Sequence, residues 1–200
     1  MRAPGRGPAD RRAAAAPRRL RGGNLPVVPE LEQHFLTDPD ALAWIVAQLD
    51  PRPGERIVEL GAGAGTVARA LLGTVAAADL TLVELDGRLA ADLRATLPGV
   101  QVRNADWQRA WPDLPPPDAV VVSLPHALVP AVLTALARRP PRVAVVAVAA
   151  AQPPWLPRTL ARTAVRRLPA AAFEPRQPFD GEAWVVRPAP RLAALSHERA

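Results

Sequence analysis

A chain of 200 residues, 49% of them apolar, is long enough to bury the core of a single domain. It contains no cysteine, which excludes disulfide bonds, thiolate metal sites and cysteine nucleophiles. The formal net charge of +6 arises in the first 24 residues, which hold seven arginines and a single acid, Asp10.

Residues 1–28 form an arm rich in arginine, glycine and proline, for which we expect disorder and contact with RNA. A segment that only aids solubility, or a wrongly assigned start, is the alternative. The arm lacks the apolar core of a secretory signal. The longest uncharged apolar run, residues 143–151, is shorter than the ~20 residues of a membrane helix. We expect a soluble, cytoplasmic monomer with no membrane partner and no metal.

Short apolar strands alternate with helical patterns from residue 36 to residue 150. The expected helices are residues 36–49, capped by Thr37 or Asp38, residues 67–72, residues 87–97, capped by Asp86, and residues 127–137, kinked at Pro130. The expected strands are residues 56–60, 80–85, 100–104, 118–122 and 142–150. Continuously apolar strands that alternate with helices indicate a parallel sheet covered on both faces.

The last fifty residues are less regular. Residues 157–167 have a basic helical pattern, in which Arg158, Arg162 and Arg166 would form one stripe for RNA phosphates, or else a merely solvated face. Residues 182–187 are expected to form a closing strand. The expected organisation is an arm, one domain and a tail, at residues 1–28, 29–190 and 191–200.

The most specific pattern is VELGAGAG at residues 58–65, where a strand runs into a glycine-rich turn before a helix. Glycine permits sharp turns and lets a ligand lie against the main chain. A dinucleotide site would have the spacing G-x-G-x-x-G, whereas an acid precedes G-x-G-x-G here. The pattern resembles motif I of S-adenosylmethionine-dependent methyltransferases. We therefore expect a cofactor site that includes Glu59, Gly61, Gly63 and Gly65.

Two more acids follow the next strands. Glu84 ends the second strand, where a carboxylate can accept hydrogen bonds from both hydroxyls of a ribose. Asp106 follows the third strand and can accept from the amine of adenine, with Trp107 beside the ring. Either acid alone could be a solvated loop residue. Because ligands of open α/β sheets bind at the carboxyl ends of strands, three acids there predict a nucleoside ligand.

EQHFLTD, at residues 32–38, resembles the G-Q-N/H-F-L-x-D signature of the rRNA adenine N(6)-dimethyltransferase family. VELGAGAG, VELD and NADW come in the family's order, and the segment at residues 168–187 resembles a later family segment, so the resemblance spans roughly residues 31–190. It implies a Rossmann-like α/β class I methyltransferase fold, with a mostly parallel seven-stranded sheet and helices on both faces. It also implies the cofactor S-adenosyl-L-methionine. Carried over to this chain, the resemblance assigns cofactor contacts to Gln33, His34, Leu36, Gly61, Glu84, Asp106 and Ser123.

The family's catalytic motif is N-L-P-Y or a close variant, and Ser123, Leu124, Pro125 and His126 stand there in this chain. The exocyclic amine of adenine is a poor nucleophile because its lone pair is delocalised into the ring. The Ser123 hydroxyl and Leu124 carbonyl would accept its two hydrogens, in a turn that Pro125 makes rigid. His126 and Phe173 would stack on the two faces of the base, or else belong to the core.

Two departures distinguish this sequence from the family. The stretch between the fifth and sixth strands is short. We also expect the chain to lack the helical C-terminal domain that helps to position rRNA in the family. The leading hypothesis is an S-adenosylmethionine-dependent methyltransferase that acts on N(6) of an adenine in RNA, with rRNA as the substrate. One alternative is a cofactor- and RNA-binding protein of the same fold without catalysis. The other is a methyltransferase of a small molecule.

Overall fold

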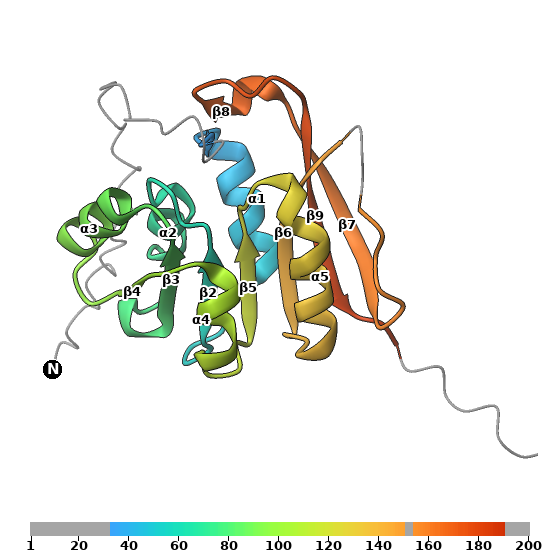
Figure 1. Cartoon of the computed structure of the whole chain (residues 1–200), viewed down its shortest axis with the longest axis horizontal. Helices are drawn as coiled ribbons and strands as arrows, with labels where there is room; N and C mark the ends of the chain where they lie inside the picture. The colour runs from blue at the N-terminus through green and yellow to red at the C-terminus, as the bar shows by residue number, and fades with distance from the viewer. Residues whose placement is uncertain (1–32, 151–153, 191–200) are drawn as a thin grey trace, which may run out of the picture.

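A seven-stranded sheet forms the centre of the computed structural model, which describes residues 33–150 and 154–190 (Figure 1). The strand order is β4-β3-β2-β5-β6-β9-β7. The strands are β2 (Ile57–Leu60), β3 (Leu80–Glu84), β4 (Gln101–Asn104), β5 (Ala119–Val122), β6 (Val143–Ala149), β7 (Leu160–Leu168) and β9 (Gly181–Pro188). β2 to β6 run parallel, and β9 is antiparallel to its two neighbours. The predicted mostly parallel α/β sheet is confirmed.

Helices cover both faces of this sheet. On one face lie α1 (Pro39–Leu49), α2 (Thr66–Leu71) and α3 (Gly87–Thr96), and on the other lie α4 (Trp107–Ala110) and α5 (Val129–Arg138). Short 3-10 helices are η2 (Ala77–Asp79), η3 (Trp111–Asp113), η4 (His126–Leu128) and η5 (Ala170–Ala172). The predicted arm at residues 1–28 and tail at residues 191–200 lie outside the described residues, so these boundaries stay predictions.

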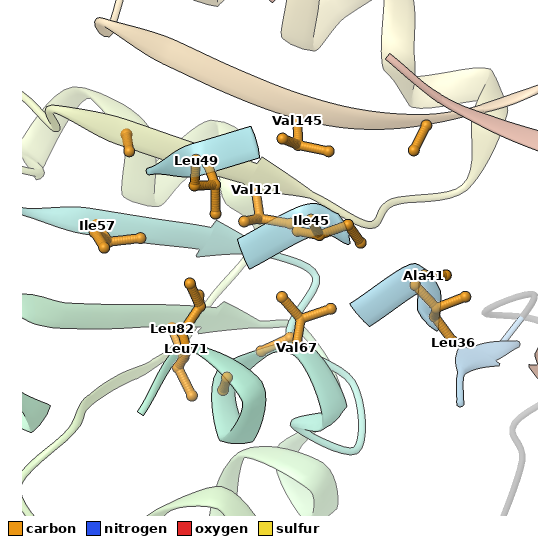
Figure 2. Packing of buried hydrophobic residues seen from close by; sticks show 14 of the residues in the cluster. Leu36, Ala41, Ile45, Leu49, Ile57, Val67, Leu71, Leu82, Val121 and Val145 are labelled. Carbon is orange, nitrogen blue, oxygen red and sulfur yellow. The ribbon is translucent and has the colours of Figure 1, made fainter. Parts of the chain in front are cut away.

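The sheet separates two buried apolar clusters, because successive residues of a strand point to opposite faces. Val121 packs toward α1 and α2, whereas Val120 and Val122 pack toward α4 and α5. Figure 2 shows the first cluster, in which Ile45 and Leu49 of α1 lie against the strands. Burying one such side chain stabilises the fold by about 1.5–3 kcal/mol. The continuous apolar runs in the sequence are therefore explained by burial on both sides.

Side-chain caps fix the start of two helices. Asp38 caps α1 and accepts a hydrogen bond from the Ala41 backbone N–H at 2.7 Å. Asp86 caps α3 in the same way, through the Arg88 backbone N–H at 2.8 Å. Each cap contributes about 1 kcal/mol. Both caps confirm sequence predictions, and both set the positions of loops that reach the site described below.

The predicted basic helix at residues 157–167 is wrong, because residues 160–168 form strand β7 at the edge of the sheet (Figure 1). β7 pairs along its length with β9, and a bulge lies between Arg162 and Ala164. Arginine spacing alone is compatible with either structure. The β-branched Thr163 and Val165 favour a strand, and pairing with β9 supplies backbone hydrogen bonds that an isolated helix could not exchange with the sheet.

The predicted single stripe of Arg158, Arg162 and Arg166 is wrong for the same reason. Arg162 is paired with Val186 and Arg166 with Ala183, and these two partners pack on opposite faces of the sheet. Paired residues point to the same face, so the two arginines diverge. The Arg162 guanidinium lies over the Trp184 ring, with its Cζ atom 4.6 Å from the ring centroid. Arg158 precedes the strand in a turn.

Two helix boundaries also differ from the prediction. Pro130 does not kink a helix that begins at residue 127; it lies in the first turn of α5, where its missing N–H costs nothing. Leu36 does not begin α1 but belongs to β1 (Phe35–Leu36), which pairs with β8 (Phe173–Glu174) in a separate two-stranded sheet. This small sheet joins the two ends of the domain above the carboxyl ends of the central strands (Figure 1).

Candidate functional site

A cavity of about 540 Å³ opens at the carboxyl ends of the parallel strands. This is where ligands of open α/β sheets bind, and the volume lies within the ~300–1,000 Å³ of small-molecule sites. The predicted site residues on its wall are Gln33, His34, Leu36, Glu59, Gly61, Gly63, Glu84, Asp106, Trp107, Ser123, Leu124, Pro125, His126 and Phe173. Gly65 lies behind the wall, where it begins α2 and packs against Leu93.

The turn after β2 is held against the turn after β5. Gly61 has a φ of +78°, and a Cβ atom on it would lie 2.5 Å from the Ser123 carbonyl oxygen and 2.9 Å from Leu124 Cδ2. Ser123 in turn donates its backbone N–H to the Leu60 carbonyl at 2.9 Å. Gly61 is therefore required for the close approach of two protein segments, in addition to any role beside a ligand.

Glu84 organises the glycine-rich turn. One carboxylate oxygen accepts a hydrogen bond from the Gly63 backbone N–H at 2.7 Å, and the other accepts from the Asp86 backbone N–H at 2.8 Å. The residue is 7% exposed. A carboxylate offers about four acceptor positions, so two remain for ligand hydroxyls. The protein thus fixes this carboxylate before any ligand arrives.

The segment that precedes α1 covers one side of the cavity. The Gln33 side-chain amide donates to Asp86 Oδ2 at 3.1 Å. Burial raises the pKa of Asp86, but hydrogen bonds from Gln33 and Arg88 outweigh burial and hold the pKa below its usual range. The Phe35 ring covers Gly63, at 2.7 Å from the position of an added Cβ. The segment therefore packs against the loop that carries Asp86 and against the glycine-rich turn.

The same segment is tied to the end of the domain. Leu36 is paired with Phe173 in the β1–β8 sheet, and the backbone N–H groups of Thr37 and Asp38 both donate to the Ala172 carbonyl. Nδ1 of His34 lies 2.9 Å from the Pro175 carbonyl oxygen. Two stretches about 140 positions apart in the chain are thus joined beside the cavity.

Asp106 and Trp107 have partly structural roles. Asp106 caps α4, and its Oδ1 atom accepts a hydrogen bond from the Gln108 backbone N–H at 2.7 Å. Trp107 is only 6% exposed and packs in the core cluster beside Leu60 and Val83, although its edge reaches the cavity. Its position beside an adenine ring stays a prediction.

Glu59 is the most deeply buried acid of the wall. It is 1% exposed, and its Oε2 atom has no hydrogen-bond partner. Burial, and then the nearby charge of Glu84, raise the pKa of Glu59 well above its usual range. The sequence pattern marked Glu59 as a site residue, but its lack of a partner depends on packing that the sequence does not reveal.

The turn after β5 is the exposed wall of the cavity. Ser123 and His126 are exposed, and Pro125 accepts from the Leu128 backbone N–H at 2.9 Å as η4 begins. The His126 ring meets the Phe179 ring edge-on, with centroids 5.7 Å apart. Phe173 is 9% exposed on the same wall. Its stacking role and that of His126 stay predictions.

Two aromatic wall residues were not predicted. Phe35 lies inside the quoted EQHFLTD signature, between His34 and Leu36, so a reading of that whole segment could have included it. Phe179 is 39% exposed and lies in a proline-bounded loop that carries no periodic signal. Only the folded chain brings Phe179 to His126.

The charges of the wall distinguish between classes of ligand. Across residues 33–150 and 154–190, the wall has three carboxyl groups, those of Glu59, Glu84 and Asp106, and no arginine. Phosphate groups are usually held by arginine or lysine as well as by backbone N–H groups. Carboxylates accept from hydroxyl and amine groups. The wall therefore fits an uncharged or positively charged nucleoside, such as S-adenosylmethionine, better than a phosphate-bearing dinucleotide.

The described residues contain neither a candidate metal site nor a candidate membrane-spanning helix. Within them, no group of three or more histidine, aspartate or glutamate side chains is arranged to hold a metal ion. No helix in the same part of the chain is long and apolar enough to cross a membrane.

Comparison with known proteins agrees with this geometry. The family model "Ribosomal RNA adenine dimethylase" matches residues 28–108, which include the signature, the glycine-rich turn and all three wall acids. Ribosomal RNA small subunit methyltransferase A of Corynebacterium efficiens is 35% identical over 135 residues, which cover 58% of this chain and 44% of that protein. The resemblance to the rRNA adenine dimethylases is thereby confirmed for this part of the chain. The chain spans less than half the length of the Corynebacterium efficiens protein.

Other relatives show how far the resemblance is shared. The solved structure of the 23S rRNA methyltransferase ErmE has a TM-score of 0.64 and 25% identity, over 77% of this chain and 69% of that chain. Protein-L-isoaspartate O-methyltransferase of Methylorubrum populi is 36% identical over 102 residues, which cover 49% of this chain and 47% of that protein. The fold is the Rossmann-like fold of class I methyltransferases. The sheet and glycine-rich turn alone do not distinguish RNA from protein as the substrate.

Proposed function

We propose that this chain is an S-adenosylmethionine-dependent methyltransferase that transfers methyl groups to the exocyclic N(6) amine of an adenine in RNA, with rRNA as the substrate. The observation that carries the proposal is a single cavity that is lined by Glu84 and Asp106 and by the Ser123-Leu124-Pro125 turn. When bound, the cofactor would supply an electrophilic methyl group. The first two residues would hold its nucleoside, and the turn would hold the acceptor.

The cofactor side of the cavity is arranged for a nucleoside. The Glu84 carboxylate, already oriented by Gly63 and Asp86, would accept from the two ribose hydroxyls. Asp106 would accept from the adenine amine. Phe35 and Leu36 would exclude water from above the glycine-rich turn. These groups need no rearrangement to do so, which lowers the cost of binding.

The acceptor side is arranged around the turn after β5. The Ser123 hydroxyl and the Leu124 carbonyl would accept the two hydrogens of the adenine amine, which directs its nitrogen toward the methyl group. The His126 ring and Phe173 would enclose the base, which must leave its stack to enter. Because Gly61 holds the Ser123 carbonyl at close range, the two reactants would be fixed relative to each other.

RNA contact is proposed through the arginine-rich arm, which lies outside the described residues and stays a prediction from the sequence. Cytoplasmic localisation and a monomeric state likewise stay predictions. The edge strand β7 is not proposed as a continuous basic stripe, since its arginines diverge.

A second candidate function is a cofactor- and RNA-binding protein without catalysis. The observation that favours it is the turn itself, where a freely rotating serine hydroxyl replaces the family's asparagine amide and histidine replaces tyrosine. Ser123 is exposed, so packing does not hold its hydroxyl in one direction. This candidate predicts cofactor binding as tight as that of the enzyme with no methyl transfer.

Transfer of label from tritiated S-adenosylmethionine tests the proposal. Unmodified rRNA and a mixture of unfolded proteins are offered separately to the wild type, to Glu84→Ala and to Asp92→Ala, whose acid lies exposed on α3 away from the cavity. We expect label in RNA only, lost in Glu84→Ala and retained in Asp92→Ala. Label in protein and not in RNA would overturn the proposal that RNA is the substrate. Cofactor binding without label in either acceptor would support the second candidate.

A further inference from the structure

The carboxyl group of Glu59 is buried beside the cavity without a full set of partners. The residue is 1% exposed, and Oε2 has no hydrogen-bond partner. A buried polar group without a partner costs free energy, so such a group on a ligand site's wall calls for an explanation. The residues that line the cavity include Glu59 itself.

The register of the sheet shows which part of a ligand lies nearest to Glu59. Glu59 of β2 is paired with Leu82 of β3 and with Val121 of β5. Glu84 comes two positions after Leu82, so its side chain points to the same face of the sheet as that of Glu59. Ser123 follows the last residue of β5, two positions after Val121. Glu59 thus belongs to the strand between Glu84 and the turn that carries Ser123, two positions before the level of both residues.

This order matches the order of groups along the cofactor of the proposed function, on which the inference rests. Asp106 follows β4 and Glu84 ends β3, and they are assigned to adenine and ribose. Ser123 follows β5 and is assigned to the methyl acceptor. The sulfonium sulfur links the ribose to the methyl group that is transferred. It would therefore lie above the strand between β3 and β5, which is β2.

We propose that the Glu59 carboxyl group is protonated in the free protein and releases its proton when the sulfonium cation of S-adenosylmethionine binds, so that the site prefers this charged methyl donor to its uncharged product. The proton leaves the carboxyl oxygen for solvent, and the carboxylate that remains faces the cation. No covalent bond of the cofactor changes in this step.

The charges around Glu59 support this assignment. Burial and the charge of Glu84 on β3 disfavour the carboxylate, whereas the Ala68 backbone and Arg69 on α2 favour it less strongly. Arg69 is engaged elsewhere, with the Ala64 carbonyl and the Thr96 hydroxyl. A cation near Glu59 would reverse the balance, because an opposite charge within about 4–6 Å favours the ionised form of a carboxyl group. S-adenosylhomocysteine has no sulfonium charge and cannot do so.

Titration calorimetry tests the inference without any measurement of methyl transfer. Binding of S-adenosylmethionine and S-adenosylhomocysteine is measured at pH 7 in two buffers that differ in ionisation enthalpy, which gives the number of protons released. The cofactor's own ammonium group titrates as well, so the quantity of interest is the difference between the wild type and Glu59→Gln. Asp92→Asn, which removes an exposed acid of α3, is the matched control.

We expect the wild type and Asp92→Asn to release about 0.3–1 more proton than Glu59→Gln when S-adenosylmethionine binds, and to show a smaller difference with S-adenosylhomocysteine. The preference for the methyl donor over the product should fall about tenfold in Glu59→Gln. If Glu59→Gln does not fold, the wild type alone is informative. Its affinity for S-adenosylmethionine, relative to S-adenosylhomocysteine, should rise as pH increases from the usual pKa of a carboxyl group toward the raised pKa of Glu59.

Equal proton release by wild type and Glu59→Gln, or equal release with the two ligands, would overturn the inference while leaving the proposed function intact. A wild-type affinity ratio that does not change with pH would also overturn it. Failure of the wild type to bind S-adenosylmethionine at all would overturn the proposed function and this inference together. The two failures are therefore distinguishable.

Discussion

The wall of the cavity built from residues 33–108 and the wall built from residues 119–183 are held in different ways. In the first, Glu84 and Asp86 are nearly buried, and each accepts hydrogen bonds that fix neighbouring loops. In the second, Ser123 and His126 are exposed, and His126 is in contact with the half-exposed Phe179. The carboxylates of the first wall are thus fixed by hydrogen bonds before a ligand binds, whereas the Ser123 and His126 side chains of the second wall are not enclosed by packing.

The family model of the rRNA adenine dimethylases matches residues 28–108 and so ends before the Ser123 turn. Rigid, buried contacts suit a cofactor that is common to many methyltransferases. Exposed contacts suit a substrate that differs among them. We therefore propose that the first wall binds the cofactor and that the second selects the substrate, and four changes to the chain test this division.

The largest effect is expected where the two walls touch. Gly61→Ala would place a Cβ 2.5 Å from the Ser123 carbonyl oxygen, on a backbone with φ of +78°. Left-handed strain of about 1–2 kcal/mol and crowding of about 1–3 kcal/mol should together destabilise the fold by about 3 kcal/mol. For a chain of this size that lowers the unfolding temperature by about 6–12 °C, as calorimetry can measure.

Gly54→Ala is the matched control for this substitution. Gly54 has a φ of +77°, but no atom lies within 4 Å of an added Cβ. Gly54→Ala should therefore destabilise the fold only through left-handed strain, by about 1 kcal/mol. Its unfolding temperature should fall by about 2–4 °C. Equal losses in the two variants would contradict the close approach of the two walls.

The next effect concerns the first wall alone. Glu84→Gln keeps the size of the side chain but removes its charge and replaces one of the two accepting oxygens by an NH2 group, which would face the backbone N–H of either Gly63 or Asp86. Hydrogen bonds to a charged acceptor contribute about 1.5–3 kcal/mol, so we expect the affinity for S-adenosylmethionine to fall about 10- to 100-fold. Calorimetric titration measures the affinity, with Asp92→Asn as the control. If the affinity for S-adenosylmethionine falls less than threefold, Glu84 does not bind the ribose.

A smaller effect with the opposite profile is expected on the second wall. Ser123→Ala removes one hydrogen-bond acceptor beside the amine and should lower kcat about 10- to 100-fold, since a single oriented dipole contributes at most about 2.7–4 kcal/mol. Cofactor affinity should change less than twofold. Ser123→Asn, which restores the family's amide, should recover kcat. Single-turnover rates with labelled cofactor test both variants, and an unchanged rate in Ser123→Ala would exclude the serine from catalysis.

The smallest effect is a pH-dependent change in stability at Glu59. Burial and Glu84 raise the pKa of Glu59 in the folded state. Below the usual pKa of a carboxyl group, the folded and unfolded chains are both protonated, and the stabilising contribution is complete. As pH rises, the unfolded chain loses its proton first, so wild-type stability declines toward the raised folded-state pKa. Glu59→Gln has no such proton to lose.

Thermal unfolding without cofactor, at a series of pH values from about 4.5 to 8, should therefore show an unfolding temperature for Glu59→Gln that rises relative to the wild type. The exposed substitution Asp92→Asn should show no such trend. A constant difference between Glu59→Gln and the wild type over this range would mean that Glu59 has an ordinary pKa.

The same division separates what the sequence predicts from what it does not. The strands and the glycine-rich turn are predictable because a buried apolar run and a positive φ each demand particular residue types. Asp38 and Asp86 are predictable as caps for the same reason. The place of the three acids beside the cavity is predictable because each acid stands at or just after the end of a parallel strand. These features depend on contacts within short stretches of the chain.

The features that were missed depend on distant contacts. The sequence predicts a helix in place of strand β7 because the spacing of Arg158, Arg162 and Arg166 fits either structure, and only pairing with β9 decides between them. The β1–β8 sheet joins residues about 140 positions apart. The contact between His126 and Phe179, and the unpartnered Oε2 of Glu59, likewise follow from packing and not from any local pattern.

The most direct test of the central claim is the identity of the methylated product. Unmodified rRNA is incubated with S-adenosylmethionine that carries an isotopically labelled methyl group, digested to nucleosides and separated by chromatography with mass detection. The account predicts labelled N(6)-methyladenosine or N(6),N(6)-dimethyladenosine with the wild type, and at most about a tenth as much with Ser123→Ala. Label on any other nucleoside, or no labelled nucleoside from a protein that binds the cofactor, would contradict it.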